Sequence, residues 1–127
     1  MRRTTLFATL LLGTMFNVIM AQSSNTVDVA TLQAEMAKNG VQLVDVRTPQ
    51  EWNSGHIQGA VHVDWFSDDF KARILELDKE KPVRLYCAAG GRSEDARVML
   101  REMGFKEVKD LDGGMSAWKK AGAPVEK

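Results

Sequence analysis

The stretch VRLYCAAGGRS, residues 83–93, decides how the chain folds. Residues 83–87 form a short, mainly apolar run that predicts a strand, and Lys81-Pro82 breaks the chain before it. Gly104 is placed to end the helix that follows, whose apolar residues recur at helical spacing: Ala96, Met99, Leu100 and Met103. Cys87 therefore stands at the end of a strand, before a short loop of alanine and glycine and the start of a helix.

Strands and helices alternate on both sides of this stretch. Asp28 is a suitable N-cap for a helix that Asn39-Gly40 ends, and its apolar residues are Val29, Leu32 and Met36. The other predicted elements are strands at 41–46, 60–63 and 108–111 and helices at 66–77 and 115–120. Such alternation implies right-handed crossovers. We expect an α/β fold with a mostly parallel central sheet of about five strands and helices on both faces.

The composition is typical of one soluble globular domain. The chain has 127 residues, and its 17 lysines and arginines balance its 17 aspartates and glutamates. A balanced chain lacks the basic excess of nucleic-acid-binding domains, so we expect no nucleic-acid partner. The single cysteine excludes an intramolecular disulfide.

The first 21 residues have the pattern of a secretory signal peptide. Arg2 and Arg3 form a basic start, residues 6–16 are apolar, and Ala21 is a small residue suited to the position before cleavage. An uncleaved membrane anchor is the alternative, but Asn17 interrupts the apolar run early. We expect export, to the periplasm if the source is Gram-negative. Residues 22–127 would then form the mature domain, with no membrane association.

The loop after Cys87 has the features of an anion cradle around a thiolate. The positive end of a helix dipole lowers the pKa of a thiol at its N-terminus. Alanines and glycines expose backbone N–H groups to a ligand, and Arg92 adds a forked cation suited to an oxyanion. We expect Cys87 to act as a nucleophile on an atom carried by an anion. The candidate anion-binding residues are Ala88, Ala89, Gly90, Gly91, Arg92 and Ser93.

Three motifs in order over residues 26–125 resemble the signature of the rhodanese family, the single-domain sulfurtransferases. They are Asp45-Val46-Arg47 with Glu51-Trp52, Gly55-His56-Ile57 and Gly59-Ala60; Cys87-x-x-Gly90-x-Arg92-Ser93; and Leu111-x-Gly113-Gly114 with Trp118, Gly122 and Pro124-Val125. The resemblance implies a three-layer rhodanese-like fold. It also implies a ping-pong reaction in which Cys87 takes a sulfane sulfur from a donor such as thiosulfate, becomes a persulfide, and passes the sulfur to cyanide or a thiol.

The loop departs from the family pattern at two positions. Active members often carry basic residues where this chain has Ala88 and Gly91, so Arg92 is the only cation that the loop supplies. A persulfide carrier or a non-catalytic binding module with the same fold is the alternative function. A phosphatase or arsenate reductase would need five residues between cysteine and arginine, whereas this loop has four, Ala88 to Gly91.

Four polar residues near the first motif are interpreted as structural. We expect Arg47 and Glu51 to form an ion pair after the strand, and His56 to satisfy backbone groups in a turn. Asp45 lies near the end of a strand and is also assigned a structural role. His62 has no suitably spaced partner, so we expect no metal and no cofactor. The expected partners are a small-molecule sulfur donor and acceptor, or a thiol protein, and the expected state is a monomer.

Overall fold

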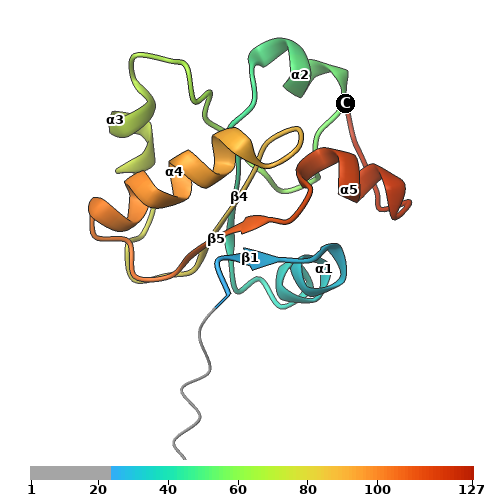
Figure 1. Ribbon diagram of the computed structural model, residues 1–127, viewed down its shortest axis with the longest axis horizontal. Helices are drawn as coiled ribbons and strands as arrows, with labels where there is room; N and C mark the ends of the chain where they lie inside the picture. The colour runs from blue at the N-terminus through green and yellow to red at the C-terminus, as the bar shows by residue number, and fades with distance from the viewer. Residues whose placement is uncertain (1–23) are drawn as a thin grey trace, which may run out of the picture.

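A computed structural model describes residues 24–127, which form one α/β fold (Figure 1). Its strands are β1 (Thr26–Val27), β2 (Gln42–Asp45), β3 (Val61–His62), β4 (Val83–Tyr86) and β5 (Val108–Leu111). They form one sheet in the order β1-β5-β4-β2-β3, and every pairing is parallel. The expected α/β class and parallel sheet are confirmed. The signal peptide predicted over residues 1–21 lies outside the described residues.

Helices cover both faces of this sheet (Figure 1). They are α1 (Val29–Ala37), α2 (Pro49–Ser54), α3 (Phe70–Ile74), α4 (Gly91–Glu102) and α5 (Gly114–Lys120). Leu32 of α1 and Trp118 of α5 pack with Tyr86 and Leu43 on one face. On the other face, α3 and α4 pack against β2, β4 and β5 through a second core that includes Ile74, Leu100, Val44, Leu85 and Val108. The two apolar cores account for the three layers.

Three elements differ from the sequence-based expectation. Neither the two-residue strand β1 nor the helix α2 was predicted. Pro49 at the start of α2 and the Thr48–Glu51 capping box are nevertheless helix-start signals. The observed helix α3 is shorter than the predicted helix over 66–77, because it begins at Phe70 and ends at Ile74. Phe66, which was placed on its apolar side, is 67% exposed.

The sheet order places β4 in the centre, between β5 and β2. In a parallel sheet the ends of neighbouring strands meet at one edge, where ligand sites form. The loop after β4 therefore lies at the carboxyl edge of the sheet. Within residues 24–127, no helix is long and apolar enough to cross a lipid bilayer.

Candidate active site

Cys87 follows the last residue of β4 and is only 1% exposed. Four residues later, α4 begins at Gly91, and its N-cap is Gly90. Gly90 has φ +127°, a conformation that favours glycine because it has no Cβ. This sharp turn folds the loop back over the sulfur and directs the start of α4 towards it.

The thiol of Cys87 receives hydrogen bonds from its own loop. The Gly90 N–H donates to Sγ at 3.0 Å, and the Ser93 hydroxyl lies 3.4 Å from Sγ. Burial alone would raise the pKa of the thiol. The Ser93 hydroxyl and the N–H groups of Ser93, Gly90 and Ala89 outweigh burial and hold the Cys87 pKa below its ordinary value. The loop thus favours a thiolate, as the sequence predicted.

The start of α5 holds the main chain of the loop from behind. The Met115 N–H donates to the Cys87 carbonyl at 2.8 Å, and the Ser116 N–H donates to the Ala88 carbonyl at 3.0 Å. A Cβ atom on Gly114 would lie 2.5 Å from the Cys87 carbonyl oxygen, so only glycine allows this approach. The sequence marks Gly114 only as part of a motif, because its contact with the loop depends on how α5 packs.

The guanidinium of Arg92 forms an ion pair with the carboxylate of Glu51. The contact has two points, Nη1–Oε1 at 2.7 Å and Nη2–Oε2 at 3.0 Å. Arg92, followed by the Thr48 hydrogen bonds, overcomes the effect of burial and lowers the pKa of Glu51 to about 2. The prediction that Arg47 pairs with Glu51 was therefore wrong: as the third residue of α2, Glu51 faces the cysteine loop.

Arg47 pairs instead with Asp45, which is completely buried at the end of β2. Arg47 Nη2 lies 2.7 Å from Asp45 Oδ2 and also donates to the Gly55 carbonyl at 2.7 Å. A buried carboxylate needs such a partner, because an unpaired charge is costly to bury. This pair fixes the segment between α2 and β3 to the sheet, in keeping with the structural role expected of Asp45 and Arg47.

His56 lies in a packed turn that directly follows α2. Its ring stacks on Trp52 with centroids 3.5 Å apart, and Nδ1 lies 3.1 Å from the Trp52 carbonyl oxygen. The main-chain N–H of His56 donates to the Glu126 carbonyl at 2.8 Å, which brings the C-terminus beside α2 (Figure 1). Among residues 24–127, no three histidine, cysteine or acidic side chains form a metal-binding cluster.

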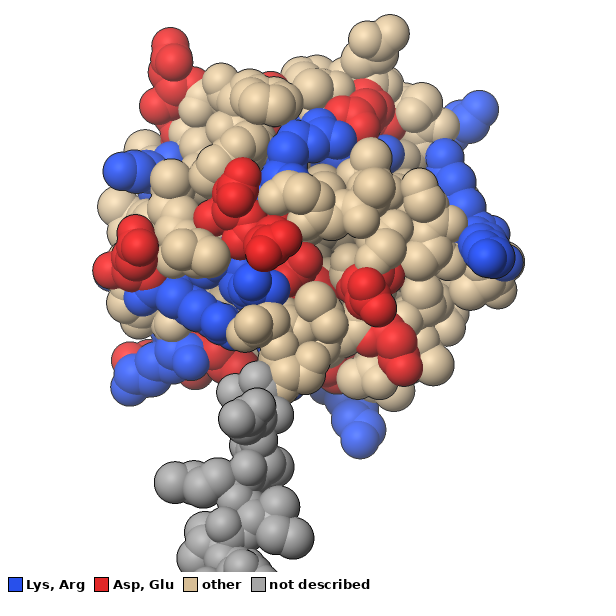
Figure 2. Space-filling model, in the orientation of Figure 1, with Lys and Arg blue, Asp and Glu red and all other residues tan. Residues whose placement is uncertain are grey.

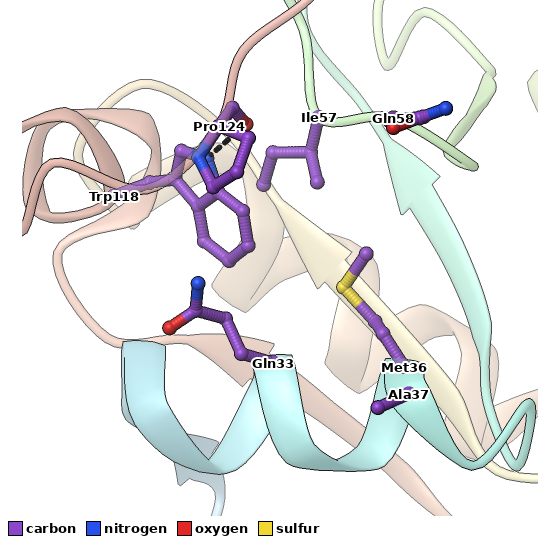
Figure 3. Close-up of a pocket in the computed structure, with 7 residues that line it drawn as sticks. All are labelled: Gln33, Met36, Ala37, Ile57, Gln58, Trp118 and Pro124. Atoms are coloured by element: carbon purple, nitrogen blue, oxygen red, sulfur yellow. Dashed lines mark hydrogen bonds between the residues drawn. The ribbon is translucent and has the colours of Figure 1, made fainter.

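Two hollows in the surface differ in whether they border the loop of Cys87. A polar cleft of about 490 Å³ borders the cysteine loop at Ala89, Gly90 and Gly91 and continues to α4 and β5. An apolar pocket of about 290 Å³ lies between α1 and the C-terminal segment, and no loop residue lines it (Figure 3). In Figure 3, Met36 and Trp118 line this pocket from different helices. Of these two hollows in the described residues, the polar cleft is the one that adjoins the loop of Cys87.

Acidic and basic side chains are interspersed on the face shown in Figure 2. Phe66 is a large apolar residue at the surface near Arg92. It is 67% exposed, and its ring centroid lies 6.0 Å from the Arg92 guanidinium carbon. An exposed aromatic ring thus borders the Arg92–Glu51 pair.

Comparison with known proteins identifies the family. A family model described as "Rhodanese-like domain" matches residues 28–121, which include Cys87 and all five helices. The chain belongs to the rhodanese-like family. The match covers all but the two ends of residues 26–125, whose motifs resemble this family.

Similar proteins include bacterial enzymes named thiosulfate sulfurtransferase GlpE. The one from Ectopseudomonas mendocina is 40% identical over 86 residues, which cover 67% of this chain and 76% of that enzyme. The one from Shewanella oneidensis is 39% identical over 83 residues, covering 65% and 80% of the two chains. The protein is therefore a rhodanese-type sulfurtransferase.

Solved structures support the same assignment. A rhodanese-related protein from Thermoplasma volcanium superposes with a TM-score of 0.72 at 25% identity, covering 81% of this chain and 98% of that one. A rhodanese-like domain from Anabaena superposes with a TM-score of 0.72 at 30% identity, covering 81% and 79%. The expected rhodanese-like fold is confirmed.

Proposed function

We propose that Cys87 carries the sulfur in this sulfurtransferase. Its thiolate attacks the outer sulfur of a donor such as thiosulfate, the S–S bond of the donor breaks, and sulfite leaves with the bonding electrons. The observation that carries this proposal is the set of hydrogen bonds to Sγ from the Gly90 N–H and the loop beside it. These donors stabilise a thiolate without a separate general base.

In the second half of the reaction, the outer sulfur of the Cys87 persulfide is transferred to a nucleophile. Cyanide or a thiolate attacks that sulfur, and the Cys87 thiolate leaves, restored to its starting state. The same N–H groups that bind the thiolate stabilise it as the leaving group, because they are fixed by the turn at Gly90 before the reaction begins. The proposed anion-binding groups are the main chain of residues 88–91, the Ser93 hydroxyl and Arg92.

Intact-protein mass spectrometry tests the proposed persulfide. After incubation with thiosulfate, we expect the mass to rise by one sulfur atom, and dithiothreitol should reverse the gain. Because the chain has one cysteine, Cys87→Ser must abolish the adduct. A folded wild-type protein that forms no adduct with thiosulfate or another sulfane donor would overturn the proposal.

A thiol on a partner protein is a second candidate acceptor. Phe66 favours it, because an exposed ring beside the Arg92–Glu51 pair offers apolar contact that cyanide does not need. Transfer rates from the persulfide to cyanide and to a cysteine-containing peptide separate the two. Phe66→Ser should slow transfer to the peptide only, and an equal effect on both acceptors would argue against this candidate.

Export with removal of residues 1–21 is also proposed, from the signal pattern described above. Whole-protein mass in cell fractions tests it. A chain that begins near residue 22 in the exported fraction supports the proposal. An intact Met1 in the cytosolic fraction contradicts it.

A further inference from the structure

Ser93 connects the Cys87 thiol to a buried carboxylate on the neighbouring strand. Its Oγ lies 3.4 Å from Cys87 Sγ and 3.4 Å from Asp110 Oδ2. Ser93 is fully buried, and Asp110 in β5 is 3% exposed. The three side chains therefore form a continuous contact chain inside the protein, from the nucleophile to an acidic group that the proposed sulfur transfer does not use.

The Ser93 hydroxyl has one hydrogen and more than one acceptor. Besides Sγ and Oδ2, the Gly90 carbonyl lies 3.3 Å from its oxygen. An ionised Asp110 is the strongest of these acceptors at a pH where Cys87 is still a thiol, because hydrogen bonds to a charged group are the stronger ones. The hydroxyl hydrogen then points away from the sulfur. A protonated Asp110 instead donates to Ser93 Oγ, which leaves the Ser93 hydrogen for the sulfur.

We propose that Asp110 is a positioning residue for Cys87, and that its protonation state decides whether the Ser93 hydroxyl hydrogen is donated to the Cys87 sulfur or to the Asp110 carboxylate. This inference rests on the proposed role of Cys87 as the sulfur carrier. No bond to sulfur forms or breaks in the switch. Only the hydrogen bonds that join Cys87, Ser93 and Asp110 change direction when a proton is added to or removed from Asp110.

The charges around Asp110 are few and can be named. From α4, Arg97 Nη1 contacts Asp110 Oδ1 at 2.6 Å, and Glu94 reaches the same guanidinium at 4.0 Å. The neighbouring strands present Thr26 of β1 and Leu85 of β4 in register with Asp110, and neither ionises. Burial raises the pKa of Asp110 and outweighs the lowering effects of Arg97 and Ser93.

The polar cleft beside the loop gives Asp110 a route for proton exchange. Its lining includes Gly90, Arg97, Asp110 and Asp112. Neither Arg92 nor Glu51 lines this cleft. A proton can therefore reach or leave Asp110 through the cleft without passing the Arg92–Glu51 pair. The proposed switch at Asp110 is thus separate from Arg92, the cation proposed to bind the sulfur donor.

Asp110→Asn is a close mimic of the protonated state. Arg97 donates to the oxygen at the Oδ1 position, so the amide oxygen should face Arg97. The amide NH₂ then occupies the Oδ2 position and donates to Ser93 Oγ, which directs the Ser93 hydrogen to the sulfur. Asp112→Asn is the matched control, because Asp112 is exposed, lines the same cleft, and makes no hydrogen bond with Ser93.

The pH dependence of Cys87 alkylation by iodoacetamide measures the effect directly, since the chain has no other cysteine. We expect Asp110→Asn to move the alkylation midpoint about one pH unit lower. In the Ser93→Ala background the same substitution should move it less than half as far, because only the change in charge remains. The midpoint is the readout, because a thiolate of lower pKa is also less nucleophilic and the limiting rate changes with it.

Each result decides the inference. No shift, an equal shift with and without Ser93, or an equal shift in Asp112→Asn would overturn it. If Asp110→Asn does not fold, the wild-type profile decides: a step on its acidic side that Ser93→Ala removes supports the switch, and a single inflection contradicts it. Incubation of the same wild-type sample with thiosulfate tests the persulfide separately, because alkylation reports on Ser93 and Asp110 even if no adduct forms.

Discussion

Glu51 Oε1 lies 2.7 Å from Arg92 Nη1, and Glu51 Oε2 lies 3.0 Å from Arg92 Nη2. The only cation of the cysteine loop is thus neutralised by a carboxylate from α2. A donor dianion must compete with that carboxylate for the guanidinium, because a planar guanidinium presents a limited set of donors to an anion. Glu51 therefore opposes the binding of thiosulfate while it keeps Arg92 beside the loop.

Glu51→Gln should improve the use of thiosulfate. The substitution removes the competing charge, and the amide oxygen can still accept from the Thr48 N–H and hydroxyl, which cap α2. We expect kcat/KM for thiosulfate to rise about tenfold, the change that roughly 1.4 kcal/mol of binding produces. Steady-state rates measure it, with Thr48→Ala as the control for damage to the cap. A fall in kcat/KM with an intact fold would show that Glu51 serves to position Arg92 rather than to compete with the donor.

The Glu51–Arg92 pair should also give the fold a stabilising contribution that is lost in acid. The pKa of Glu51 is lowered to about 2 from an ordinary 4.5, so its contribution is fully present above pH 4.5 and is lost as pH falls towards 2. Both groups are partly exposed to solvent, so the contribution is about 1 kcal/mol or less.

Thermal unfolding of wild-type protein and Glu51→Gln measures this contribution. At neutral pH the wild type should unfold a few degrees higher, about 4–8 °C per kcal/mol for a domain of this size. The gap should close between pH 4.5 and 2, the interval set by the two Glu51 pKa values. A gap that stays constant through this interval would contradict a contribution from the Glu51 charge.

Arg92→Ala should weaken the use of an anionic donor. A charge-assisted hydrogen bond is worth about 1.5–3 kcal/mol, so kcat/KM for thiosulfate should fall roughly ten- to a hundredfold. The loss has a second cause, because the unpaired Glu51 carboxylate then repels the donor. Arg92→Lys should recover only part of the rate, since a point charge replaces a fork. A normally folded Arg92→Ala with the wild-type kcat/KM would mean that main-chain N–H groups alone hold the anion.

For a physical reason, the sequence was sufficient to predict four of the five strands and the place of Cys87 at the end of β4. Each of these depends on neighbours along the chain: the apolar run before Cys87, the glycines after it, and the helix that follows. Strand β5 was predicted with its observed bounds, Val108–Leu111. Helix α2 was missed because a six-residue helix has too few turns to show an apolar period, and only its Pro49 and capping box mark it.

The partners of charged side chains could not be predicted in the same way. Arg47 and Glu51 are one helical turn apart, which makes a pair between them plausible along the chain. The fold instead brings Arg92 to Glu51, although 41 residues separate them. Asp110 was missed for a similar reason, because its contacts with Ser93 and Arg97 depend on how α4 packs over β5. Distances between chemical groups from different elements follow from packing and not from spacing.

Tyr86→Phe should destabilise the protein without removing the nucleophile. The fully buried Tyr86 hydroxyl accepts a hydrogen bond from the Ile57 N–H at 3.1 Å. Phenylalanine would leave that buried N–H unpaired, which costs about 1–3 kcal/mol. Denaturant unfolding measures the loss. Because α5 holds the Cys87 carbonyl independently, persulfide formation should persist, and its abolition in a folded variant would contradict this division of roles.

Gly114→Ala should disturb the cysteine loop itself. Gly114 has φ +56°, and a Cβ there would lie 2.5 Å from the Cys87 carbonyl oxygen and 2.9 Å from the Ala88 carbonyl carbon. These are main-chain atoms, so the loop or the start of α5 must move. The hydrogen bonds from Met115 and Ser116 to the loop carbonyls should then lengthen. The N–H groups around the sulfur should lose their alignment as a result.

Gly122→Ala is the matched control for this substitution. Gly122 also has a positive φ, +71°, but a Cβ there meets no atom within 4 Å. Both variants should lose stability through backbone strain, about 1–3 kcal/mol. Only Gly114→Ala should also raise the pH midpoint of Cys87 alkylation and lower the rate of persulfide formation at least tenfold. Equal losses of rate in the two folded variants would show that strain near the C-terminus, and not the contact between Gly114 and Cys87, governs the loop.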